Sequence, residues 1–311
     1  MIELFRTPNY DFIGKRKWAY YASIVFTAIG LLSLVVQGGL RYDIDFTGGT
    51  LVQVRFERAV GVEKIRASLA RIGLGESVIQ QFGDPREFIL RMPLTAERPE
   101  AVGKRVQAAM SADPALGTLE VRRVEFVGPQ VGRDLQIQAL YAVLASLGGI
   151  LLYIAMRFDL KGGVAAVVAV FHDVLVCLGA MSLTNREFSL PVLAALLTII
   201  GFSVNDTIVA YDRLRENRGK GQRGLTFAQQ MNLAVNQTLS RTVLTSLTVF
   251  FSTAILLFFG GKTLEDFAFV LFVGVITGTY STTYVAAAIV VDWTNYVEGR
   301  VRRAKKAVAK A

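Results

Sequence analysis

The chain has 311 residues, 52% of them hydrophobic, and a mean hydropathy of +0.43. A soluble domain of this length is less apolar, so the composition excludes that class and favours a protein with several membrane spans. The net charge of +9 would suggest nucleic acid as a partner of a soluble chain. Here the basic residues flank apolar runs, which is typical of membrane orientation beside anionic lipid, and nucleic acid is not expected.

Six apolar runs are long enough to cross about 30 Å of hydrocarbon at about 1.5 Å per residue. They cover residues 18–36, 137–158, 163–183, 188–211, 241–260 and 267–293. The first run lacks a clear cleavage pattern after it, so we interpret it as a retained anchor. The sequence therefore predicts an α-helical polytopic membrane protein with six transmembrane helices.

Basic residues mark one side of the membrane. They cluster before the first run, between the second and third, between the fourth and fifth, and after the sixth, whereas the opposite loops carry only Arg186 and Lys262. The positive-inside rule places both termini in the cytoplasm, with the protein in the cytoplasmic (inner) membrane. The predicted parts are 1–37 (cytoplasmic N-terminus and first helix), 38–132 (external domain), 133–296 (helices two to six, with a cytoplasmic loop at 212–240) and 297–311 (basic cytoplasmic tail).

The external segment has the pattern of a small α+β domain. Residues 42–57 form an extended stretch around a Gly-Gly turn, 77–92 resemble two strands around Asp84-Pro85, and 118–128 a last strand. Residues 62–74 and 98–110 have helical periodicity. The order β-α-β-β-α-β is that of the ferredoxin-like fold, inserted after the first transmembrane helix. On the other side, residues 225–240 predict an amphipathic helix at the cytoplasmic surface.

Enzyme chemistry has no support in the sequence. The segment at 258–263 resembles a phosphate loop, but that motif requires glycine where Leu256 stands. No serine or cysteine accompanies a base in a recognisable array. With one histidine, His172, and one cysteine, Cys177, a structural zinc site is excluded. We expect no catalytic residue, metal or cofactor.

Asp206 is the most informative residue, because it lies inside the fourth apolar run. An ionised side chain within a span costs about 2.5–3.5 kcal/mol. Asp212 stands at the cytoplasmic edge six residues later, about 9 Å along a helix, and aspartate is too short to reach that edge. Asp206 shares a helix face with Ser203 and Arg213. We expect this face to look into the bundle or a hydrated cavity.

A partner for Asp206 is predicted at the start of the fifth run. Arg241, Thr245, Thr248 and Ser252 follow the spacing of one helix face and form a polar stripe. The two runs are antiparallel, so Asp206 and Arg241 are able to approach each other near the cytoplasmic boundary. Such a pair would switch with protonation of the carboxylate. The alternative is that Arg241 is an interfacial anchor and the hydroxyls serve helix packing.

Other polar residues within the spans are weaker candidates. His172-Asp173 lies near the middle of the third run, either as a second relay group or as an interhelical hydrogen bond. Gly274 and Gly278 have the spacing that lets two helices approach closely, which favours a packing role. The full set of candidate relay or supporting residues is His172, Asp173, Ser203, Asn205, Asp212, Arg213, Thr245 and Thr248.

Together these motifs resemble the SecF family of protein-export membrane proteins, in the SecD/SecF group of the RND superfamily. The resemblance covers nearly the whole chain. It is carried by DFTGGT (45–50), VGPQVG (127–132), YIAMRF (153–158), HDV (172–174), GFSVNDTIVAYDRLREN (201–217) and SRTVLTSLT (240–248). The family pattern often has tyrosine at Phe202 and threonine at Val249, and neither departure removes a titratable group.

The resemblance implies the function. Members form half of an RND-type transporter, pair with SecD, and assist the SecYEG channel, with YajC as a further partner, in moving unfolded polypeptide with the proton gradient. The family's coupling aspartate and arginine match Asp206 and Arg241, and an aspartate from SecD would complete the relay. Two rivals are half of a small-molecule RND exporter, for which one external domain is too little, and an assembly factor that transduces no energy.

Overall fold

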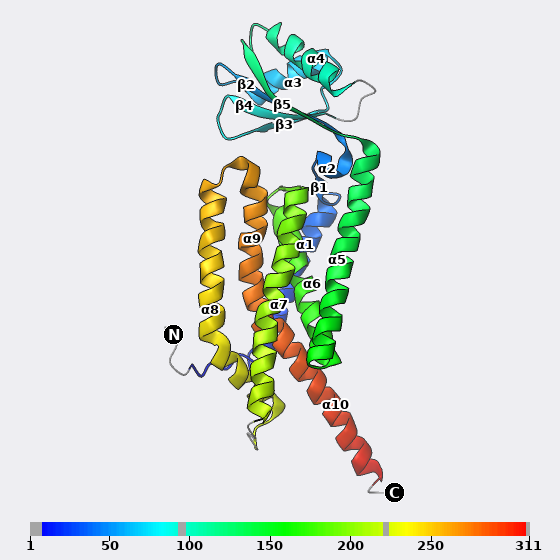
Figure 1. The fold of residues 1–311 in the computed structure, drawn as a ribbon, viewed down its shortest axis with the longest axis vertical. Helices are drawn as coiled ribbons and strands as arrows, with labels where there is room; N and C mark the ends of the chain where they lie inside the picture. Colours follow the sequence, from blue (N-terminus) through cyan, green and yellow to red (C-terminus); the bar gives the residue numbers. More distant parts are fainter. Residues whose placement is uncertain (1–7, 93–97, 220–223, 309–311) are drawn as a thin grey trace.

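The computed structural model describes residues 8–92, 98–219 and 224–308. It has two parts, a bundle of long helices and a small α+β domain at one end of that bundle (Figure 1). The described N-terminal residues and the end of α10 lie at the opposite end of the bundle from the small domain.

Six helices are long and apolar enough to cross a membrane, which confirms the predicted fold class. They are α1 (Arg16–Val36), α5 (Pro129–Arg157), α6 (Leu160–Leu183), α7 (Leu190–Gly219), α8 (Phe227–Phe259) and a composite sixth helix. The sixth runs without a break through α9 (Lys262–Ser281), a π-helical turn, η1 (Thr282–Ala286), and α10 (Ala287–Val308).

Two local expectations were wrong. Residues 227–240 do not form a separate surface helix, because they are the first part of the continuous α8, where a Thr226–Gln229 capping box begins the helix. The stretch 42–57 is not all extended, since α2 (Ile44–Thr47), capped by the Asp43 side chain, interrupts it before two glycines with positive φ. Residues 220–223 of the basic loop and 309–311 of the tail lie outside the described residues.

The small domain has the predicted order of elements. These are β2 (Gly49–Phe56), α3 (Val62–Arg71), β3 (Val78–Gln81), β4 (Glu87–Met92), α4 (Pro99–Ser111) and β5 (Leu119–Val127). The antiparallel strands lie in the order β3-β4-β2-β5, which is the ferredoxin-like arrangement. Strand β2 is central and buried, and α3 and α4 cover the face of the sheet away from the bundle (Figure 1). Val52, Val54 and Phe56 form its core with apolar residues of both helices.

The opposite face of the sheet looks toward the bundle, and a polar cavity of about 710 Å³ lies between them. A two-stranded parallel ladder lies at the bundle side of this gap and joins β1 (Arg41–Tyr42), just after α1, to β6 (Glu187–Phe188), between α6 and α7. The Arg91 side chain of β4 forms ion pairs with Asp43 (2.9 Å) and Glu187 (2.6 Å) beside this ladder. The Arg91–Glu187 ion pair therefore attaches the external domain to the bundle, in addition to the two chain connections between them.

Glycines set the closest helix contacts in the bundle. Gly30 of α1 faces Gly179 of α6, and a Cβ on either would lie 2.6–2.7 Å from the other's Cα. On α9, a Cβ at Gly274 would collide with Ile199, and one at Gly278 would meet Ser203 at 3.2 Å. Both α9 glycines thus face α7, in agreement with the packing role predicted for them.

Candidate functional site

Asp206 lies within α7 and is 3% exposed, so its side chain is inside the bundle as the sequence predicts. Its Oδ2 atom is buried and has no hydrogen-bond partner among the described residues. A buried carboxylate oxygen without a donor is costly when ionised. This unpartnered atom distinguishes Asp206 from the other buried carboxylate of the bundle, Asp173.

Arg241 lies on α8, which packs against α7. Within the described chain, however, no hydrogen bond or ion pair joins the two side chains, and Arg241 is exposed on the surface of the bundle. Direct pairing is thus absent in this conformation, and a shared role stays a prediction. The two residues remain on adjacent helices, as the antiparallel arrangement requires.

The polar stripe of α8 makes local bonds. The hydroxyls of Thr245, Thr248 and Ser252 donate to backbone carbonyls one turn earlier, at 2.7–3.0 Å. Thr248 and Ser252 are exposed on the outer face of the helix. Among the described residues, these three hydroxyls bond only within α8 and to no other helix.

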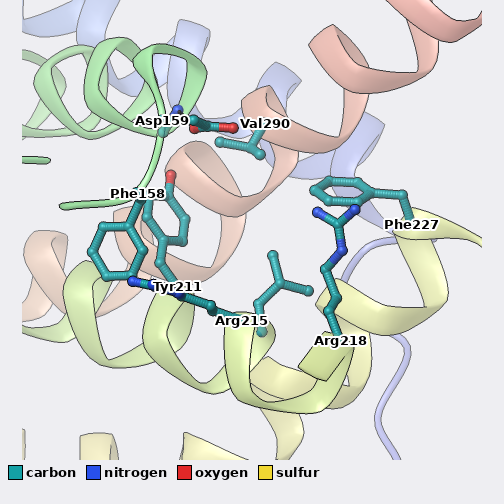
Figure 2. Close-up of a pocket in the computed structure, with 9 residues that line it drawn as sticks. Phe158, Asp159, Tyr211, Arg215, Arg218, Phe227 and Val290 are labelled. Carbon is teal, nitrogen blue, oxygen red and sulfur yellow. Dashed lines mark hydrogen bonds between the residues drawn. The ribbon is translucent and has the colours of Figure 1, made fainter. Parts of the chain in front are cut away.

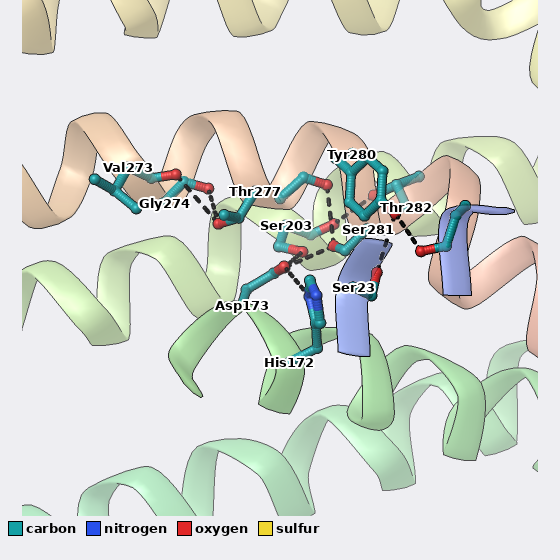
Figure 3. A network of polar contacts seen from close by, with 12 residues as sticks. Ser23, His172, Asp173, Ser203, Val273, Gly274, Thr277, Tyr280, Ser281 and Thr282 are labelled. Carbon is teal, nitrogen blue, oxygen red and sulfur yellow. Dashed lines mark hydrogen bonds and ion pairs between the residues drawn. The ribbon is translucent and has the colours of Figure 1, made fainter. Parts of the chain in front are cut away.

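Asp173 is the centre of a polar cluster that the sequence located only in part (Figure 3). Its Oδ2 accepts hydrogen bonds from Ser203 of α7 and Ser281 of α9, each at 2.7 Å, and its Oδ1 lies 3.1 Å from His172 Nδ1. Asp173, Ser203 and Ser281 are all at most 1% exposed. One carboxylate thereby connects three helices through fully partnered oxygens, which is the interhelical bond considered for this position.

The cluster continues toward α1 through Tyr280. The Tyr280 hydroxyl donates to the Ala19 carbonyl (2.7 Å) and lies 3.0 Å from Ser23 Oγ. The His172 ring lies beside the Tyr280 ring, with 6.3 Å between centroids. Polar contacts therefore extend from α1 to α7 across the middle of the bundle, as Figure 3 shows.

The π-helical turn η1 begins next to this cluster. Thr282, its first residue, has its hydroxyl 3.2 Å from that of Thr207, one residue beyond Asp206. A π-turn leaves a helix locally irregular and is frequent at functional sites. Tyr280, Ser281 and Thr282 were not predicted from the sequence, although a run of hydroxyl residues at 280–284 inside an apolar span is the signal that marks them.

The remaining candidates lie apart from the cluster. Asn205 is exposed on α7. Asp212 pairs with Arg157 (2.9 Å), and Arg213 pairs with Glu216 (2.7 Å) while donating to Gln237. The contacts of Asp212 and Arg213 thus lie near the end of α7, at the end of the bundle opposite the external domain. Among the residues described, no group of three or more His, Cys, Asp or Glu side chains is placed to hold a metal ion.

Comparisons with known proteins identify the family. Residues 107–296 match the model described as protein export membrane protein SecD/SecF, C-terminal, and residues 34–60 match the SecD/SecF GG motif. The chain is 43% identical over 298 residues to the protein translocase subunit SecF of Desulfurispirillum indicum, with 94% of each chain covered. The chain belongs to the SecF family. The SecF of Pseudomonas aeruginosa is 40% identical to it over 285 residues, covering 92% of this chain and 91% of that relative.

Solved structures agree with this membership. The crystal structure of SecDF from Thermus thermophilus, a translocon-associated membrane protein, matches with a TM-score of 0.81 at 44% identity. SecDF in its super-membrane-facing form matches with a TM-score of 0.70 at 42% identity. The first match covers 93% of this SecF-family chain and the second covers 100%. The matched regions make up only 39% and 41% of the two solved SecDF chains. It therefore corresponds to one part of those longer proteins.

Proposed function

We propose that the chain is the SecF subunit of a proton-driven SecD–SecF complex that assists the SecYEG channel in exporting unfolded polypeptide across the cytoplasmic membrane. A separate SecD chain supplies the other half of the transporter, and YajC is included as a further partner. Both termini lie in the cytoplasm and the ferredoxin-like domain lies outside. The basic flanks and the position of the described N-terminal residues, at the end of the bundle opposite that domain, support this orientation.

The buried carboxylate of Asp206, with one oxygen lacking a donor, is the observation that carries the proposal. When Asp206 is ionised, its buried charge is stabilised by Arg241, whose side chain would move closer to it. When it is protonated, the attraction is lost and α7 and α8 are free to separate. Alternating access of water from the two sides of the membrane would then couple proton entry and release to two shapes of the bundle.

The polar neighbours take supporting roles in this proposal. Ser203 shares the α7 segment with Asp206, and Thr207 links that segment to the π-turn through Thr282. Because the turn is irregular, the sixth helix is able to adjust its register there at small cost. A change in the Asp206 region would thus be transmitted to the sixth helix, which continues into α10.

Substitution of Asp206 tests the proposal. In vesicles that contain the chain, SecD and the SecYEG channel, Asp206→Asn should leave the protein inserted and folded but abolish the stimulation of export by a proton gradient. Asp134→Asn, at an exposed aspartate of α5, removes the same charge and should leave the stimulation intact. Replacing the proton gradient by a sodium gradient identifies the coupling ion.

Two outcomes would reject energy coupling by this chain. If the proton gradient stimulated export by Asp206→Asn as strongly as export by the wild type, the Asp206 carboxylate would not be required for coupling. If Arg241→Gln behaved in the same way, the chain would act as an assembly factor that stabilises the translocase without transducing energy.

A further inference from the structure

A second site lies at the end of the bundle opposite the external domain. An open cavity of about 290 Å³ is lined by the α5–α6 connection, the last turns of α7, the start of α8 and Val290 of α10. Figure 2 shows Phe158 and Tyr211 on one side of it and Phe227 on the other. Leu214 completes a wall that is mainly aromatic and aliphatic. The cavity is separate from Asp206 and from the Asp173 cluster.

Two arginines line this apolar cavity. Arg215 and Arg218 stand one turn apart on α7. Arg215 donates to the backbone carbonyl of Arg157 (3.2 Å), and the Arg218 guanidinium lies over the Phe227 ring, 5.6 Å from its centroid. These are contacts to neutral groups, and in the described part of the chain neither guanidinium has a carboxylate within ion-pair distance.

Neighbouring arginines show that pairing is the usual arrangement here. Arg213 and Arg157 each form an ion pair, with Glu216 and Asp212 respectively. The carboxylate that lines the cavity, Asp159, accepts a hydrogen bond from the Gly162 backbone N–H (2.7 Å) and so caps α6. The cavity lining thus contains two guanidinium groups with unused N–H donors. Its one carboxylate, Asp159, already caps α6. An anion would complete the cavity.

The depth of the cavity indicates which anion. Arg157 ends α5, and α7 becomes polar after Tyr211, so the cavity lies where the apolar part of the bundle gives way to water. Lipid phosphates occupy this level, and basic pockets between membrane helices bind anionic headgroups. Guanidinium groups bind phosphate in a bidentate manner, while aromatic walls accommodate the glycerol and the first acyl carbons.

We propose that this cavity is a binding site for the headgroup of an anionic phospholipid, with Arg215 and Arg218 as the phosphate ligands. The lipid would join the cytoplasmic ends of α6, α7 and α8, whose relative positions matter in any conformational cycle. The proposal does not depend on proton coupling, and lipid binding is measurable in a protein that transports nothing.

Native mass spectrometry of the full chain tests this directly. The protein is released from nanodiscs that contain equal amounts of phosphatidylglycerol and phosphatidylcholine, and the retained lipid is counted. We expect the wild type to retain phosphatidylglycerol selectively. The double variant Arg215→Gln, Arg218→Gln should bind it about twenty-five-fold more weakly, because each guanidinium near the surface contributes about fivefold. The matched control Arg213→Gln, Arg300→Gln loses the same charge and should retain the lipid.

Equal retention of phosphatidylglycerol by the double variant and the control would overturn the proposal. Displacement of the lipid by millimolar glycerol phosphate would overturn the lipid assignment, since it would show a site for free phosphate. If the double variant does not fold, the two single variants are compared, and each should lose about fivefold in affinity. Absence of any loss in both would again reject the site.

Discussion

Arg91, in the external sheet, and Glu187, in the connection between α6 and α7, form a close ion pair across the gap between domain and bundle, 2.6 Å from nitrogen to oxygen. Both side chains are 14% exposed. The same guanidinium pairs with Asp43, which caps α2. One cation therefore holds two carboxylates at the attachment point of the domain, next to the β1–β6 ladder.

Arg91→Gln should loosen this attachment. Removing one partner of a fully buried ion pair costs about 3–5 kcal/mol, and the cost here should be smaller because this pair is only partly buried; it arises because Asp43 and Glu187 would face each other without a cation. Burial already raises the pKa of Glu187, and the Arg91 charge opposes that rise, so the variant should raise the Glu187 pKa further. Hydrogen exchange of the β1 and β6 amides measures the effect. Arg123→Gln, at an exposed arginine of β5, is the control and should cost about 0–1 kcal/mol.

Asp84 gives a pH dependence of known sign in the turn between β3 and β4. Hydrogen bonds from the Arg86 side chain and backbone, with the Arg55 charge, lower its pKa from 3.8 to about 2. A lowered folded-state pKa contributes stability that is complete above the ordinary value and is lost as pH falls from 3.8 toward 2. Carboxyl NMR titration should show this pKa, and Arg86→Gln should return it toward 3.8. An unchanged Asp84 pKa in that variant would contradict the assignment.

Features that arise from local sequence patterns were predictable, whereas contacts between residues far apart in the chain were not. Long apolar runs and period-two strands are local patterns, so the six spans and the order of strands follow from the sequence. The β1–β6 ladder is two residues long on each side and joins positions 41–42 to 187–188, which no local pattern connects. The same holds for Ser281, whose partner Asp173 lies 108 residues away.

The candidate site shows the same division. Asp206 and Asp173 were identified because a carboxylate inside an apolar run is costly wherever it points. Helix spacing placed Arg241 on a polar stripe but did not fix the direction of that stripe, and the structure places Arg241 on the surface. The start of α8 was misplaced because Arg241 resembles a span boundary, whereas the helix begins at Phe227.

The contact between α1 and α6 depends on two glycines. A methyl group at Gly179 would lie 2.6 Å from the Gly30 Cα, so Gly179→Ala should push the helices apart and destabilise the protein. Gly201, in the interior of α7, has open space around its Cβ position, and Gly201→Ala should be neutral or stabilising by up to about 1 kcal/mol through helix propensity. Thermal unfolding in detergent compares them, and a similar change in both variants would refute the close contact.

The last prediction separates the two buried carboxylates by their hydrogen bonds. Both Asp173 oxygens have partners, whereas Asp206 Oδ2 has none among the described residues. A carboxylate that accepts two hydroxyl protons from other helices stabilises their packing, and each such bond in a membrane is worth about 0.6–2 kcal/mol. Ser281→Ala should therefore lower stability by about that amount, while Ser146→Ala, whose hydroxyl bonds only within α5, should not.

Asp173→Asn should likewise lower the unfolding temperature, because a neutral amide oxygen is a weaker acceptor than a carboxylate for the hydroxyls of Ser203 and Ser281. Below that temperature, export by the Asp173→Asn variant should still respond to the proton gradient, whereas export by Asp206→Asn should not. The reason is that the packing role of Asp173 requires no exchange of a proton with water. A folded Asp173→Asn protein that has lost the gradient response would instead assign Asp173 and His172 to the proton path. Measuring unfolding and gradient response on the same preparation decides between these two roles.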